Sequence, residues 1–117
     1  MVKEIAFLAY SVRDVPAATA FYRDVLGLRT GDMVSEHWVE FDVAGVAFGI
    51  GNGEPLGFIP GKSTGLMLEV DDAAAEHARL RERGANVENL IETPVCYMAF
   101  VYDPEGNKLG IHQRKAR

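Results

Sequence analysis

Glu40, Glu69 and His112 are the residues of this chain best suited to move a proton. An imidazole titrates near neutral pH, and a carboxylate beside it can orient the ring or take part in general acid–base catalysis. Such chemistry requires the side chains to face one cleft. A histidine at the rim of a binding site with its hydrogen bonds satisfied is an equally good interpretation, so both stay open.

Three aromatic residues offer a different chemistry. Phe7, Trp38 and Tyr97 carry flat rings that stack on planar groups, and an aromatic face also attracts cations. The single cysteine, Cys96, excludes an intrachain disulfide and a cysteine-based zinc cluster. These residue types favour non-covalent binding or proton transfer over thiol chemistry.

The elements that must position these residues form a unit that occurs twice, because apolar residues recur at strand spacing and helix spacing in the same order in both halves. The first copy is expected to contain a strand at 5–12, a helix from Asp14 to Gly27, and strands at 29–34, 36–43 and 46–50. The second copy is expected to contain a strand at 65–70, a helix from Asp71 or Asp72 to Gly84, and strands at 86–91, 96–102 and 107–113.

A repeated hairpin supports this duplication. The stretch "DVAGVAFGI" at 42–50 returns as "DPEGNKLGI" at 103–111, an offset of 61 residues (103 − 42). Val12 and Val70, which end the first strand of each copy, differ by 58 (70 − 12), so three residues are gained within the second copy. A unit that cannot bury both faces of its sheet alone normally packs against its twin.

The composition is that of a globular domain, with 117 residues of which 48% are hydrophobic and 25% charged. The formal net charge of −5 argues against nucleic acid as a partner, since phosphate binding requires clustered Lys and Arg. The apolar run "IAFLAYSV" is too short to span a membrane and lacks a signal-peptide cleavage pattern. We therefore expect a cytoplasmic protein without a membrane partner.

Three stretches, "VRDVPAATAFYRDVLGL", "VDDAAAEHARLRERGA" and "DPEGNKLGI", resemble the vicinal oxygen chelate superfamily, also called the glyoxalase/bleomycin resistance/dioxygenase family. The resemblance implies an α+β fold in which two βαβββ modules form a cup-shaped mixed sheet. It implies one domain over residues 1–117, with a first module at about 1–52, a connector at about 53–63 and a second module at about 64–117. Many family members dimerise, with the cup built within one chain or between chains, so we expect a homodimer.

The resemblance also places the family's metal ligands. Metal-dependent members supply one ligand, usually His, Gln or Glu, from the first and fourth strand of each module. The matching positions here are Phe7, Gly49, Gly65 and Gly110. None can bind a divalent cation through its side chain, and a catalytic metal site needs about three protein ligands. We therefore expect no metal and no cofactor at the family site.

Strand alternation predicts what faces the cup instead, because residues two apart share a face of a sheet. Val39, Phe41 and Val43 form a complete apolar stripe for the helix side, which leaves Trp38 and Glu40 for the cup. In the seventh strand, the repeat assigns Tyr97, Ala99 and Val101 to the same face as Trp38.

The predicted ligand-binding set combines these faces with the strand glycines, which leave room for a ligand. It consists of Phe7, Trp38, Glu40, Gly49, Gly65, Met67, Glu69, Tyr97, Gly110 and His112. A closed, dry interior in which these aromatic residues pack against each other is the alternative interpretation.

Two classes of function follow. The first is a metal-independent protein that binds or sequesters a small aromatic or cationic compound, as the drug-sequestering resistance members of the resembled family do. The second is an enzyme of the lyase, isomerase or dioxygenase type that works without a metal or with an unconventional metal site, and uses Glu40, Glu69 and His112 as acid–base groups. Because the family's chemistry generally depends on the missing ligands, binding is the stronger hypothesis.

Overall fold

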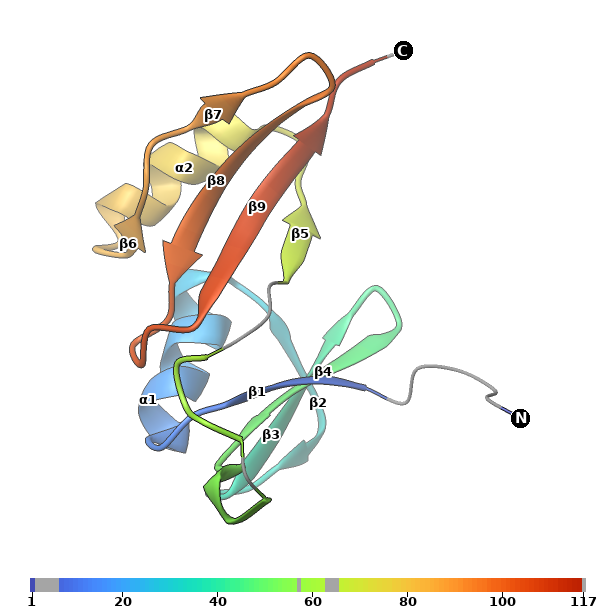
Figure 1. Cartoon of the computed structure of the whole chain (residues 1–117), viewed down its shortest axis with the longest axis vertical. Helices are drawn as coiled ribbons and strands as arrows, with labels where there is room; N and C mark the ends of the chain where they lie inside the picture. The colour runs from blue at the N-terminus through green and yellow to red at the C-terminus, as the bar shows by residue number, and fades with distance from the viewer. Residues whose placement is uncertain (2–6, 57, 63–65, 117) are drawn as a thin grey trace.

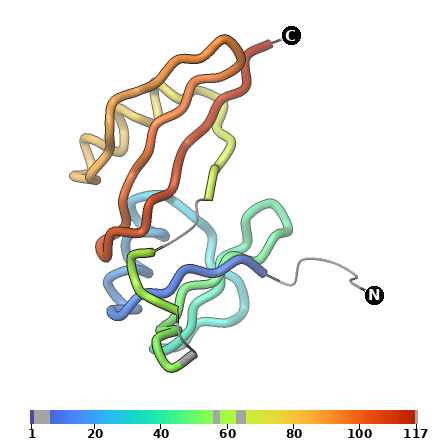
Figure 2. Tube along the Cα trace, in the orientation of Figure 1, coloured from blue at the N-terminus to red at the C-terminus, as the bar shows by residue number. Residues whose placement is uncertain are grey.

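The structure is a computed structural model of the chain that describes residues 1, 7–56, 58–62 and 66–116. Two modules lie one above the other, joined by a connector that contains the 3₁₀ turn η2 (Glu54–Leu56) (Figure 1, Figure 2). The first module consists of β1 (Leu8–Ser11), α1 (Val15–Ala20), the π-helical segment η1 (Phe21–Val25), β2 (Arg29–Val34), β3 (Trp38–Val43) and β4 (Val46–Gly51). The second consists of β5 (Met67–Glu69), α2 (Ala73–Glu82), β6 (Asn86–Val87), β7 (Ile91–Glu92), β8 (Cys96–Tyr102) and β9 (Lys108–Arg114).

Each module forms its own sheet, and the two sheets share one topology. The first sheet has the strand order β1-β4-β3-β2, and the second has the order β5-β9-β8-β6, with the short β7 also paired to β8. In both, the first strand runs parallel to the last, and the remaining pairs are antiparallel. The predicted α+β fold of two βαβββ modules is confirmed.

The helices begin and end where the sequence signals predict. Asp14 accepts a hydrogen bond from the amide of Ala17 at 3.0 Å, and Asp72 accepts one from the amide of Ala75 at 3.1 Å, so an aspartate caps each helix. Of the two candidates for the second cap, Asp72 is therefore the one used. Gly27, just beyond η1, adopts a φ of 78°, the left-handed conformation that stops a helix.

The helices cover one face of each sheet. Val39 and Phe41 of β3 and Phe48 and Ile50 of β4 are buried in the cluster that contains Val15, Ala18 and Tyr22 of the first helical segment. In the second module, Leu80 of α2 packs in a cluster with Ala99 and Ile111. The opposite face of each sheet, which we call the open face, carries the alternate residues of every strand.

One predicted face assignment is wrong. Ala99 and Val101 of β8 are fully buried on the helix side of the second sheet, so Tyr97, which alternates with them, also lies on that side. The open face carries Phe100 instead, which pairs with Gly110 of β9. The correction removes Tyr97 from the set of residues that share a face with Gly110 and His112.

The turn between β8 and β9 joins the second module to the first. The Tyr22 hydroxyl donates a hydrogen bond to Asp103 Oδ2 at 3.0 Å, and Asn107 Nδ2 donates to the carbonyl of Ser11 at 3.2 Å. Tyr22, Asp103 and Asn107 are buried. Burial, helped by the Asp103 carboxylate, raises the pKa of Tyr22 above its ordinary value, so the hydroxyl remains a donor. The second copy of the hairpin therefore links the modules.

No helix in the described ranges is long and apolar enough to cross a membrane.

Candidate functional site

The open face of the first sheet centres on Trp38. Its ring lies over Gly49 and Gly51 of β4, so close that a Cβ at either glycine would collide with it. Phe7 packs edge-to-face against the ring, with centroids 5.4 Å apart and planes at 73°. The side chain therefore faces away from α1, as predicted, because Val39 and Phe41 already fill the helix side.

Glu40 orients the indole. The Trp38 Nε1 donates a hydrogen bond to Glu40 Oε2 at 2.8 Å, between two side chains on the same face of β3. This contact satisfies the one polar atom of the indole and leaves the ring face for apolar contact. Glu40 thus acts on Trp38 within this chain, rather than on a histidine.

A pocket of about 310 Å³ lies beside Trp38. Its lining includes the predicted Phe7 and Trp38 together with residues outside the predicted ligand-binding set: Ala9, Tyr10, Ser11, His37, Gly51, Asn52, Gly53 and Phe58. Strand alternation could have found Ala9 and Ser11, because they lie two and four residues after Phe7. Phe58 belongs to the connector and carried no periodic signal.

The open face of the second sheet carries an acid–base pair. His112 Nδ1 lies 2.6 Å from Glu69 Oε1, and the amide of Arg114 donates to Glu69 Oε2 at 2.8 Å. The hydrogen bond from His112, followed by that from Arg114, lowers the pKa of Glu69 below its ordinary value. Since an ionised carboxylate only accepts, Nδ1 carries the proton, and the other ring nitrogen is left for a further partner.

Apolar side chains also lie on this second open face. The Met67 thioether lies directly over Gly110, where a Cβ would collide with it. Phe100 lies beneath Lys108, whose Nζ is 4.4 Å from the ring centroid. The sequence analysis selected Met67 and Gly110 for this face and missed Phe100, because it placed β8 in the wrong register.

The strand glycines do not leave the open cavity that was predicted. Trp38 fills the space above Gly49, and Met67 fills the space above Gly110. Gly65 lies outside the described residues. The glycines instead allow a large side chain of a neighbouring strand to lie flat on the sheet.

The family's metal site does not fit these residues. Phe7, Gly49 and Gly110 hold no side-chain oxygen, nitrogen or sulfur atom that could ligate a cation, and Met67 and Trp38 cover the glycine positions. Across the part of the chain that the structure describes, no three His, Cys, Asp or Glu side chains gather closely enough to hold a metal ion.

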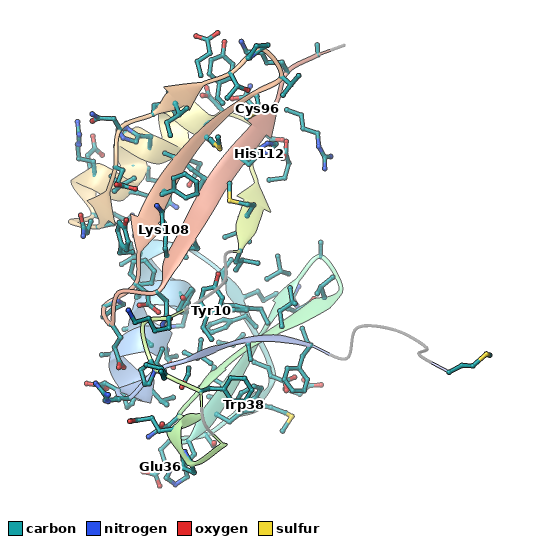
Figure 3. The ribbon with its side chains drawn as sticks, in the orientation of Figure 1. Tyr10, Glu36, Trp38, Cys96, Lys108 and His112 are labelled. Carbon is teal, nitrogen blue, oxygen red and sulfur yellow. The ribbon has the colours of Figure 1, made fainter. Side chains whose placement is uncertain are left out.

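The predicted residues fall into two groups within one chain. Phe7, Trp38, Glu40 and Gly49 lie in the first module, and Met67, Glu69, Gly110 and His112 lie in the second. Figure 3 shows Trp38 in the lower module and His112 in the upper one. Among the described residues, the pocket beside Trp38 is lined only by residues up to 58, and a pocket of about 430 Å³ beside His112 only by residues from 94 onwards.

Solved structures place this chain among known folds. An antibiotic-binding protein of Streptomyces sp. CB03234, TnmS3, superimposes with a TM-score of 0.85 at 29% identity, covering 97% of this chain and 98% of that one. A glyoxalase/bleomycin resistance protein of the same organism gives a TM-score of 0.80 at 30% identity, over 94% of this chain and 100% of that one.

Sequence comparisons agree. An uncharacterised Bacillus subtilis (strain 168) protein, YwbC, is 28% identical, over 97% of this chain and 100% of its own length. Residues 4–111 match the family model described as the Glyoxalase/Bleomycin resistance protein/Dioxygenase superfamily. The match spans both modules and the turn that joins them. The chain belongs to the glyoxalase/bleomycin resistance protein/dioxygenase superfamily.

Proposed function

We propose that this protein binds a small aromatic molecule without a metal ion, on the open face of the first sheet. The observation that carries the proposal is the partly exposed pair of Phe7 and Trp38 beside a pocket of about 310 Å³. Apolar pockets of this size with a few polar groups are the usual form of a small-molecule site. A relative with 29% identity is described as antibiotic binding, which supports an organic ligand.

The charges favour a neutral or cationic ligand. The chain carries a formal net charge of −5, which repels anions at a distance. Glu40 beside Trp38 and Glu69 on the second sheet add local negative charge to both open faces. The ligand would stack on Trp38, whose ring face is the largest aromatic surface of the site.

We also propose that the protein is one domain over residues 1–117, cytoplasmic, and a homodimer in which two copies complete each cup. Phe7 keeps 49% of its surface exposed and Met67 keeps 43%, although both lie on the open faces that carry the predicted ligand set. A large apolar side chain left exposed on each open face favours an interaction surface there. A second copy of this chain would bring the second open face against the first and unite the two groups.

A metal-free enzyme is the second candidate, and the Glu69–His112 pair is what favours it. A carboxylate that fixes one imidazole nitrogen leaves the other as a base, which is the arrangement of a general acid–base catalyst. Glu40 does not join this pair within one chain, because its carboxylate is bound to Trp38. Catalysis would therefore require the ligand to reach both open faces.

A thermal-shift screen of aromatic compounds against protein treated with EDTA tests the proposal. A ligand at a hundredfold excess over its Kd stabilises the folded protein by about 2.7 kcal/mol, which raises Tm by several degrees. Trp38→Ala should weaken the ligand about tenfold or more while the protein stays folded. Stabilisation only when a metal is restored would contradict metal independence, and turnover of a hit that His112→Gln abolishes would favour the enzyme.

A further inference from the structure

The connector forms one wall of the pocket beside Trp38. Gly53 and Phe58 line that pocket together with Phe7 and Trp38. Phe58 keeps 63% of its surface exposed, so it does not belong to the hydrophobic core. A large aromatic side chain held at a pocket in this way is available to contact a ligand.

Hydrogen bonds to β1 hold this wall in place. The Ser11 hydroxyl accepts from the amide of Gly53 at 3.0 Å and donates to the carbonyl of Phe58 at 3.3 Å. The amide of Phe58 in turn donates to the carbonyl of Gly53 at 3.0 Å, which closes the loop. One side chain of β1 therefore fixes both ends of the segment that carries Phe58.

A glycine and an ion pair restrict the segment further. A Cβ at Gly53 would lie 3.0 Å from the Cβ of Phe58, so a side chain at this position would require Phe58 to move by a few tenths of an ångström. Arg13, just beyond β1, forms an ion pair with Glu54 of η2 at 3.0 Å. These contacts hold Phe58 beside the pocket that Trp38 also lines.

Two polar groups of the pocket already make hydrogen bonds within the chain. The Ser11 hydroxyl is used by the loop, and Asn52 Oδ1 accepts from the amide of Glu54 at 3.0 Å. No Asp, Glu, Lys or Arg side chain is among the described residues that line the pocket. A charged group that entered the pocket would lose hydration, and among the described lining residues no carboxylate, ammonium or guanidinium group would compensate for that loss.

Resting on the proposed function, we propose that the connector makes this pocket selective for an uncharged planar aromatic ring, with Phe58 as the specificity-determining wall and Ser11 as its positioning residue. The ligand's ring contacts Phe7, Trp38 and Phe58, which supply aromatic surface from three separate segments of the chain. Charged substituents of the ligand remain outside this pocket.

Two fluorescent probes with the same ring system test this selectivity: neutral N-phenyl-1-naphthylamine and its charged relative 8-anilinonaphthalene-1-sulfonate. The measurement is made at high salt, which screens the net negative charge of the protein. The wild type should then bind the neutral probe about tenfold or more tightly than the sulfonate. Phe58→Ala should weaken the neutral probe about tenfold without lowering Tm. Ile59→Ala is the matched control, because Ile59 lies on the same loop with 64% of its surface exposed but does not line the pocket.

Ser11 is tested by a pair of variants. Ser11→Ala should weaken the neutral probe, and Ser11→Thr, which keeps the hydroxyl, should restore its affinity; a purely structural role would change Tm in proportion instead. Equal effects of Phe58→Ala and Ile59→Ala, or equal affinity for both probes, would overturn this inference and leave the proposed function standing. Failure of the wild type to bind either probe would contradict both.

Discussion

At the scale of single residues, the candidate site depends on glycines that let larger side chains lie flat. The ring of Trp38 lies over Gly49 and Gly51, and the thioether of Met67 lies over Gly110. The same strand positions supply metal ligands in metal-dependent relatives according to the resemblance. Here Gly49 and Gly110 leave room for Trp38 and Met67 to lie against the sheet.

Gly49→Ala should displace the Trp38 ring, because a Cβ at this position collides with it. We expect a loss of stability of about 1–3 kcal/mol from overpacking and a shift of the fluorescence of Trp38, the only tryptophan in the chain. Gly31→Ala is the control, since its Cβ would meet the carbonyl oxygen of Glu40 at an ordinary 3.5 Å. An unchanged emission spectrum in Gly49→Ala would contradict the claim that Gly49 leaves room for the Trp38 ring.

The Glu69–His112 pair predicts a dependence on pH. The pKa of Glu69 is lowered in the folded protein, first by His112 and then by the Arg114 amide, so its contribution to stability is present above the ordinary glutamate pKa of about 4.3. It is lost as the pH falls through the lower, folded value. The Tm difference between wild type and Glu69→Gln should therefore be present at pH 6 and shrink as the pH falls below about 4. A Tm difference that grows as the pH falls would contradict a lowered pKa of Glu69 in the folded protein.

At the scale of elements, the two hairpins share a sequence motif but have different turns. In the first, Val43 pairs with Val46, and Ala44 and Gly45 both have positive φ, as in a two-residue type I′ turn. In the second, Tyr102 pairs with Lys108, so residues 103–107 form a longer turn. The aspartate that begins each motif is therefore placed differently: Asp42 lies in β3, and Asp103 lies in the turn.

This difference explains which parts of the sheets the sequence predicted. Gly49 and Gly110 differ by 61 residues, but their partners Glu40 and Phe100 differ by 60. Aligning the motifs by sequence shifted β8 by one residue, and a one-residue slip moves every side chain to the other face. The apolar stripe of Val39 and Phe41 fixes the face assignment of β3, because these side chains must be buried. The open faces carry no such apolar stripe to fix the register, so Tyr97 was assigned to the wrong face.

The longer turn also predicts a stability effect. Tyr22→Phe removes the donor to Asp103 and leaves a buried carboxylate oxygen with one partner fewer, which should cost about 1–3 kcal/mol in chemical denaturation. Tyr102→Phe removes a longer, exposed hydrogen bond of 3.4 Å to Glu88, and its cost should be below about 0.5 kcal/mol. Equal effects of the two substitutions would mean that the hydrogen bond between Tyr22 and Asp103 adds no more stability than an exposed one.

At the scale of the whole molecule, the chain presents two separate open faces on two modules (Figure 1). The sequence predicted the modules, because apolar periodicity and helix caps are local signals. It did not predict that Phe58 of the connector would line the pocket, since a loop position depends on tertiary hydrogen bonds such as those of Ser11. It also left open whether the modules share a cup within or between chains.

The proposed pairing of open faces predicts a dimer in solution. Light scattering coupled to size-exclusion chromatography should give twice the 12.8 kDa mass of one chain. Met67→Lys should shift the protein toward the monomer, because it places a charge on an apolar face that the second copy covers. A monomeric wild type at the concentrations used for binding would remove the second copy from the site.

The central claim is that an aromatic ligand binds beside Trp38 without a metal. The most direct test is a titration of Trp38 fluorescence with N-phenyl-1-naphthylamine in the presence of EDTA, since the single tryptophan reports on this one site. We predict a saturable change in Trp38 emission that is unaffected by EDTA and weakened about tenfold by Phe58→Ala. An emission that stays constant through the titration, or that responds only after a divalent metal is added, would contradict the claim.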